Sequence, residues 1–246
     1  MLTVFRVEEY CAEDVVDSLK KGDVDPKDIN RIIYRYVSLQ LPRLITESSV
    51  AVRSHLHFDH VGDPTPFVNA EFVVGAESKT LLEDAYPINP ASQIQQLPPD
   101  AKVEFIDFAD PGRRTPVAPF GPYARAVDFF GDGALFLVDT PGHELGNVSC
   151  AARVAPGAFL FLGGDICHSR LCFDPGHRLV SALAHKDVGA ARATVSRLAA
   201  LHREYPDVVV LLAHDSQLAA RGMPFYPAAD LKDWALSCIR DRRGTC

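Results

Sequence analysis

A ten-residue stretch, Ser54-His55-Leu56-His57-Phe58-Asp59-His60-Val61-Gly62-Asp63, constrains this chain more than any other part of its sequence. It places three histidines and an aspartate in six consecutive positions. Residues two apart on an extended segment point to the same side, so His55 and His57 can direct their imidazoles at one ion. After a turn, Asp59 and His60 can face a second ion. Imidazole nitrogens and carboxylate oxygens suit zinc or a neighbouring divalent ion, so the motif predicts a metal site rather than a chance histidine cluster on a solvated loop.

Three further candidate ligands each follow an apolar run of the kind that forms a buried strand. They are His143 after the run in residues 134–139, Asp165 after residues 159–164, and His214 after residues 208–213. Taken singly, such a histidine is more often an ordinary hydrogen-bonded side chain. Their shared position after a strand, together with the motif, favours one common metal site.

The order HxHxDH, then His, then Asp, then His resembles the metallo-β-lactamase superfamily, and the HFDHVGDP and GGD flanks are similar to its lactonase-like branch. The resemblance runs over residues 15–218. It implies two divalent metal ions, most often zinc, bridged by Asp165. The first ion would bind His55, His57 and His143, and the second would bind Asp59, His60 and His214.

The remaining pattern is that of an α/β (α+β) protein. We expect strands at residues 29–34, 71–75 and 102–108, hairpins at 125–138 and 147–162, and helices at 13–21, 76–84, 187–205 and 230–240. The proline-rich segments 86–99 and 109–122 are expected to be loops. His202, on the apolar face of the third helix, is expected to be structural. Patterning alone does not separate an αββα sandwich from other α/β layouts, and the resemblance selects the metallo-β-lactamase αββα sandwich.

The length of 246 residues and 47% hydrophobic content fit a single domain, residues 1–246. Residues 35–53 separate the strand at 29–34 from Ser54, whereas the family pattern continues directly into the motif. We interpret them as a foreign insertion or a retained intron, with a genuine family insertion as the alternative. Only one of the segments 29–34 and 49–53 is expected to hold the strand position before the motif, and residues 50–52 are the candidates. The fold is also expected to lack its first N-terminal strands, because little sequence precedes the first helix.

Composition limits the partners and the compartment. A net charge of −7 without a basic patch disfavours nucleic acid. No apolar run approaches a membrane span or a signal peptide, so we expect no membrane partner and a cytoplasmic location. The six cysteines show no CxxC spacing and are interpreted as reduced thiols. Cys167 and Cys172 follow Asp165 and could be nucleophiles or ligands, but small buried hydrophobic residues are favoured. The sequence contains no indication of the oligomeric state.

The resemblance implies a hydrolase for a small molecule with a hydrolysable carbonyl. Two bridged cations lower the pKa of a shared water from about 16 to roughly 7, and the resulting hydroxide can attack the carbonyl. Asp59 could also orient this hydroxide or pass a proton to the leaving group. His168 stands where bacterial acyl-homoserine lactonases carry a substrate-contacting tyrosine, and it could donate a hydrogen bond or rest against its loop. Asp63 and Asp215 are expected to orient ligand histidines, with a helix cap as the alternative for Asp63.

The leading hypothesis is therefore a lactonase or lactamase that opens a cyclic ester or amide. A thioester hydrolase of the glyoxalase II type is the first alternative, although Arg170 and Arg178 are too few for the basic patch that a charged headgroup requires. An inactive, truncated gene product is the second.

Overall fold

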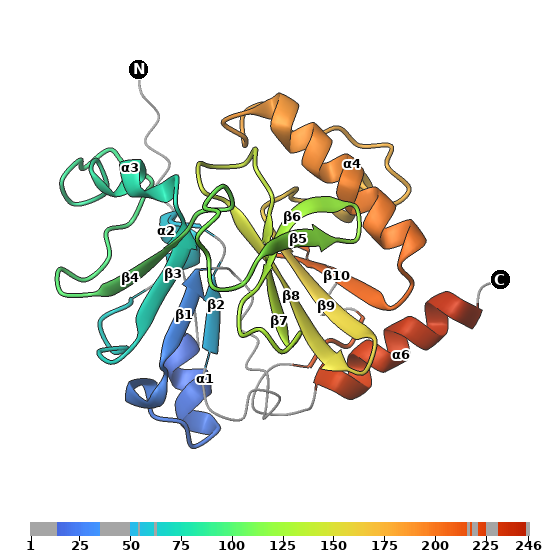
Figure 1. Ribbon diagram of the computed structural model, residues 1–246, viewed down its shortest axis with the longest axis horizontal. Helices are drawn as coiled ribbons and strands as arrows, with labels where there is room; N and C mark the ends of the chain where they lie inside the picture. Colours follow the sequence, from blue (N-terminus) through green and yellow to red (C-terminus); the bar gives the residue numbers. More distant parts are fainter. Residues whose placement is uncertain are drawn as a thin grey trace.

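The computed structural model describes residues 14–34, 50–53, 55–61, 63–215, 217, 221–224 and 231–244. Within these ranges two β-sheets lie face to face, and helices cover their outer sides (Figure 1). The expected αββα sandwich is confirmed.

The first sheet is parallel and has the strand order β2-β1-β3-β4. Its members are β1 (Arg31–Tyr34), β2 (Val50–Arg53), β3 (Glu71–Gly75) and β4 (Lys102–Ile106). The second sheet has the order β10-β9-β8-β7-β6-β5 and is antiparallel except for the pair β9 and β10. Its members are β5 (Val117–Phe120), β6 (Tyr123–Asp128), β7 (Leu135–Asp139), β8 (Val148–Ala155), β9 (Ala158–Gly164) and β10 (Val208–Leu212).

Strand β5 corrects the expectation that residues 109–122 form only a loop. It pairs with β6 at the end of the second sheet, and its register shifts between Ala118 and Phe120, on either side of Pro119. Proline lacks the N–H that a central strand needs, but it is compatible with an edge strand or a bulge. A proline-rich composition therefore did not exclude a strand here.

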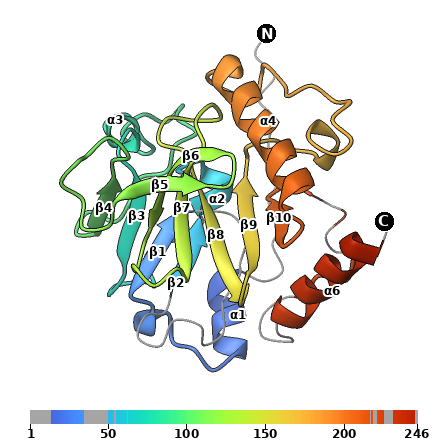
Figure 2. The same ribbon diagram turned by 45° about the vertical axis from the view of Figure 1, so that its right-hand side comes forward.

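The helices begin at the caps that the sequence provides. Asp14 caps α1 (Val15–Lys21) by accepting a hydrogen bond from the Asp17 N–H, and Asp25 caps the short 3-10 turn η1 (Pro26–Asp28). The others are α2 (Phe58–Val61), α3 (Ser78–Leu82), η2 (Arg170–Cys172), α4 (Val188–Glu204) and α6 (Leu231–Gly244). Figure 2 shows α4 and α6 on the side of the molecule that carries β10. In the described part of the chain, none of these helices is long and apolar enough to cross a membrane.

Side chains that alternate along the strands divide the core into three layers. Between the sheets, Ile33, Val73 and Leu211 pack with Trp234 of α6. Outside the first sheet, residues such as Ile32 and Phe72 cluster with Leu19 of α1. Outside the second sheet, residues such as Phe161 and Val210 cluster with Leu198 of α4. Each sheet is thus covered on both faces, as near-continuous apolar strands require.

The two strands before the motif lie side by side. Strand β2 leads into the motif, as expected for residues 50–52, but β1 also belongs to the sheet and lies between β2 and β3. The expectation that residues 50–52 hold the position before the motif is therefore confirmed, and β1 lies beside them as a second strand. Residues 35–49, which include most of the suspected insertion, lie outside the described residues.

Candidate metal centre

The candidate ligands follow the carboxyl ends of four strands. The motif follows β2 and forms the short helix α2, whereas His143, Asp165 and His214 follow β7, β9 and β10. Three of these strands sit in one sheet and one in the other, so the sandwich brings both sheets to a single site. Such strand ends are a common place for ligand binding in α/β folds.

The first group consists of His55, His57 and His143. The Nε2 atom of His55 lies 2.8 Å from Nδ1 of His57 and 3.0 Å from Nε2 of His143. All three nitrogens lie within 4.8 Å of one another. His55 and His143 are buried, and His57 is largely covered. Three ring nitrogens therefore face one small volume.

The second group consists of Asp59, His60 and His214, whose ligand atoms also lie within 4.8 Å of one another. Nε2 of His60 lies 3.5 Å from Oδ2 of Asp59, and Nε2 of His214 lies 3.9 Å from the same oxygen. His60 is buried, whereas Asp59 and His214 are exposed. This group therefore opens toward solvent.

Asp165 lies between the groups. Its Oδ2 atom is 3.6 Å from Nε2 of His143 in the first group, and 3.3 Å from Nε2 of both His60 and His214 in the second. Its Oδ1 atom is buried and has no hydrogen-bond partner among the described residues. A buried carboxylate oxygen without a donor is costly, so this position calls for a cation or a donor that the side chains themselves do not provide.

Burial and the neighbouring charges set the protonation of these groups. Burial lowers the pKa of His55 well below its usual value, and it lowers the pKa of His143 to about 4 although Asp165 acts in the opposite direction. Burial alone would raise the pKa of Asp165, but contacts with His168, His214 and His60 hold it far below its usual range. For His60 the carboxylates of Asp165 and Asp59 outweigh burial and raise the pKa to about 9.

The residues fit divalent metal ions. Burial favours the neutral form of His55 and His143, and the neighbouring histidines favour the ionised form of Asp165, which are the forms that bind metals. The donors are nitrogen and oxygen only, a set that suits zinc and related first-row ions. Four overlapping groups of His and Asp in the described part of the chain have ligand atoms close enough to share an ion, and together they contain all seven candidate ligands.

His168 faces the same site, since its Nε2 atom lies 3.2 Å from Oδ2 of Asp165 and its ring stacks on that of His214 at 5.2 Å. Cys167 next to it is fully buried, and burial raises the pKa of its thiol, as expected for a hydrophobic rather than a reactive cysteine. Asp63 and Asp215 instead accept hydrogen bonds from the backbone N–H groups of Thr65 and Gln217, so both carboxylates cap turns. No contact with a ligand histidine is recorded for either aspartate among the described residues.

Sequence reasoning missed two side chains at the site. Glu144 follows His143 directly, and its Oε2 atom lies 3.3 Å from Nε2 of His57. Its position next to a candidate ligand histidine in the sequence could have indicated that it belongs to the site. His185 is buried with both ring nitrogens lacking a hydrogen-bond partner in the described structure, and its ring lies 5.2 Å from that of His143. The chain between Asp165 and α4 brings His185 there, and no local pattern predicts that path.

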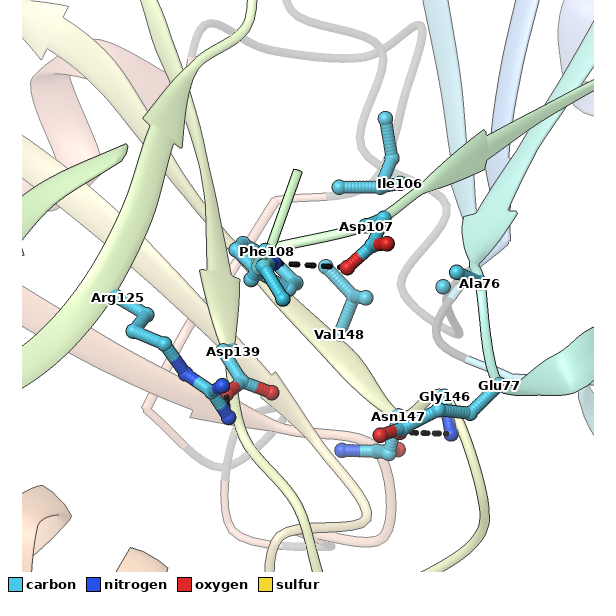
Figure 3. A pocket seen from close by; sticks show the side chains of 12 residues that line it. Ala76, Glu77, Ile106, Asp107, Phe108, Arg125, Asp139, Gly146, Asn147 and Val148 are labelled. Carbon is cyan, nitrogen blue, oxygen red and sulfur yellow. Dashed lines mark hydrogen bonds and ion pairs between the residues drawn. The ribbon is translucent and has the colours of Figure 1, made fainter. Parts of the chain in front are cut away.

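A cavity of about 80 Å³ lies near this centre, between the ends of β3, β4 and β7 (Figure 3). None of the seven candidate ligands lines it. Several of its polar groups are paired with one another: Asp139 forms an ion pair with Arg125, and Glu77 accepts a hydrogen bond of 3.2 Å from the Gly146 N–H. The histidine cluster, and not this cavity, therefore remains the candidate metal centre.

Comparisons with known proteins agree with the fold and the motif. No known protein-family model matches the chain. The chain is 31% identical over 248 residues to the cytochrome P450 monooxygenase mpaDE of Penicillium roqueforti, which covers 85% of this chain but 28% of that protein. It is 35% identical over 130 residues to the gamma-lactamase MBL2 of Gibberella moniliformis, which covers 50% of this chain and 52% of that protein. The chain thus spans between about a quarter and a half of these relatives.

Among solved structures, an N-acyl homoserine lactone hydrolase with N-hexanoyl-L-homoserine bound at its catalytic metal centre aligns with a TM-score of 0.59 and 18% identity. The alignment covers 86% of this chain and 66% of that one. The sandwich and the histidine–aspartate cluster at its strand ends define an αββα fold with a candidate metal centre. The fold is that of the metallo-β-lactamases, and a gamma-lactamase is among the relatives to which the chain is similar over half of its length.

Proposed function

We propose that this chain is a metal-dependent hydrolase that opens a cyclic ester or amide in a small molecule, with two divalent metal ions, most simply zinc, and that residues 1–246 act as one domain. The observation that supports this most is the position of Asp165, whose Oδ2 lies within 3.6 Å of histidines from both ligand groups. A single carboxylate between two groups of three donors is the arrangement that holds a pair of ions.

The ligand roles follow the two groups. His55, His57 and His143 would hold one ion, Asp59, His60 and His214 the other, and Asp165 would join them. Divalent ions in such a site supply Lewis acidity toward a carbonyl oxygen and make water more acidic. The first group is buried and the second is open to solvent, so a substrate would reach the site from the side of Asp59 and His214.

Two side chains are proposed to act on the substrate. Asp59 is partly exposed, so a carboxylate oxygen can hold a proton and deliver it to the leaving group. His168 is also partly exposed and can donate a hydrogen bond to the carbonyl oxygen as negative charge develops there.

The surroundings favour a compact substrate over one with a charged headgroup. Phe58 and Leu145, next in sequence to His57 and Glu144, are 43% and 48% exposed and offer apolar surface beside the site. Arg170, one of the two arginines considered for a headgroup, is engaged with Asp174 and with Nε2 of His202 at 2.9 Å. This disfavours the glyoxalase II-like alternative.

The test combines metal analysis with a substrate panel. The purified protein should contain close to two divalent ions per chain, and it should hydrolyse one or more members of a panel of γ-lactones, benzoxazolinone-like lactams and thioesters. His57→Ala should lose both metal and turnover, while Glu204→Ala, on the exposed side of α4, should lose neither. Turnover confined to thioesters, or a metal-free protein that still turns over lactones, would overturn the proposal.

A further inference from the structure

We propose that Glu144 is the residue that positions His57, by binding its Nε2–H and so presenting its Nδ1 lone pair to the metal. The inference rests on the metal binding in the proposed function. It assigns a role to a carboxylate that the ligand motif does not include.

The two nitrogens of His57 face different partners. Nδ1 lies 2.8 Å from Nε2 of His55, in the group of ring nitrogens, while Nε2 lies 3.3 Å from Oε2 of Glu144. A neutral imidazole has one N–H and one lone pair. With the N–H on Nε2, the donor meets the carboxylate and the lone pair meets the ion site. Either the opposite tautomer or a flipped ring would remove the lone pair from that site.

Glu144 is held so that its carboxylate cannot easily turn away. Its side chain is 1% exposed, and Oε1 accepts a hydrogen bond of 3.0 Å from the Leu145 N–H. Its backbone carbonyl accepts another, of 3.3 Å, from the Asn147 N–H. Oε2 is buried without a hydrogen bond of good geometry in the described structure, so the nearby His57 N–H is the donor best able to satisfy it.

The other charged neighbour of Oε2 contributes less. Nζ of Lys186 lies 3.7 Å away, but this side chain is 69% exposed, and solvent screens such a contact strongly. The backbone around it has a clearer function, because the Lys186 N–H donates to the His143 carbonyl at 3.0 Å and keeps the segment with Glu144 against the start of α4. Lys186 is therefore a suitable control for charge alone.

A carboxylate that orients a metal-binding histidine typically contributes about 10-fold to 100-fold in metal affinity. We expect Glu144→Ala to weaken zinc binding by that factor, measured by competition with a chromophoric chelator. Glu144→Gln retains an acceptor of the same shape and should stay within about threefold of the wild type. Lys186→Met should bind zinc like the wild type.

Long-range ¹H–¹⁵N spectra of the histidines give a readout that a purely structural role would not move. In the wild type and in Glu144→Gln, His57 should carry its proton on Nε2, with and without zinc, and in Glu144→Ala the metal-free ring should lose this single state. A wild-type His57 protonated on Nδ1, or an unchanged zinc affinity in Glu144→Ala, would overturn the inference. If Glu144→Ala does not fold, the wild-type and Glu144→Gln spectra still decide. Zinc affinity and tautomer are independent of turnover, so a protein inactive on the substrate panel could still support this role for Glu144.

Discussion

Gly142 is the residue whose replacement should most clearly link packing to the metal centre. It precedes His143, its φ is +129°, and a Cβ built on it would lie 2.2 Å from the backbone N and 2.4 Å from Cα of Ala191 in α4. Its carbonyl also accepts a hydrogen bond of 3.0 Å from the Asp187 N–H at the start of that helix. The loop that carries His143 therefore touches the helix backbone directly, which only glycine permits.

For Gly142→Ala we expect about 1–3 kcal/mol of backbone strain and about 1–3 kcal/mol from the forced separation of loop and helix, so roughly 2–6 kcal/mol in the free energy of unfolding. The matched control is Gly157→Ala in the β8–β9 turn, where φ is +72° and nothing lies within 4 Å of the added Cβ. That variant has an unfavourable φ without a clash and should lose about 1–2 kcal/mol.

Urea unfolding of the metal-free proteins gives both values, and metal analysis of the purified proteins gives the functional consequence. Gly142→Ala should bind less metal because His143 is displaced, whereas Gly157→Ala should bind as much as the wild type. Equal destabilisation of the two variants would refute the reasoning, because it would mean that φ alone, and not the contact with Ala191, explains the glycine.

His168→Ala should keep its bound metal and lose at most about 10²-fold in kcat, the scale of one positioned donor, and loss of metal would instead make His168 a ligand. Acidification from pH 6.5 to about 4 should destabilise the fold through His202, since burial and two nearby arginines lower its pKa to about 4 and the unfolded chain binds the proton first. The free energy of unfolding, measured with urea, should fall between pH 7 and pH 4.5 in both proteins. The fall should be smaller for His202→Gln than for the wild type by up to about 2 kcal/mol, after allowance for solvent screening, and equal falls would contradict this. Deletion of residues 35–53, joining Tyr34 to Ser54, should raise Tm and bound metal if the segment is foreign, and a lower Tm would show that it belongs.

Much of the sandwich could be predicted because its strands are covered on both faces. Apolar runs such as residues 159–164 and 208–213 form β9 and β10, and each ends one or two residues before a candidate ligand. The starts of α1 and α4 are also determined by residues close in sequence, since Asp14 and Asp187 accept the hydrogen bonds that a helix start requires. Where a structural requirement is met within a few residues, the sequence displays it.

The contacts that the sequence did not reveal depend on distant segments. Glu144 meets His57 across the site, and His185 reaches His143 only because of the path of the chain before α4. The role of His202 was predicted as structural from its helical face, but its partner Asp174 could not be predicted, because the pair joins the segment after η2 to α4. Spacing along the chain contains no information on such pairs.

Strands β1 and β2 show the same limit in the backbone. Tyr34 lies opposite Arg53 in their parallel pairing, so the two strands end at the same level, about 4.8 Å apart. Residues 50–52 were predicted as the strand before the motif because they directly precede it in the chain. The interior position in the sheet, next to β3, is held by β1. If Tyr34 were joined directly to Ser54, the chain would enter the motif at the same level along the strands as it now does from Arg53, but from the neighbouring strand of the sheet. Two strands thus meet the requirement that the family pattern assigns to one, and the interpretation of residues 35–53 as foreign stays a prediction that the deletion variant tests.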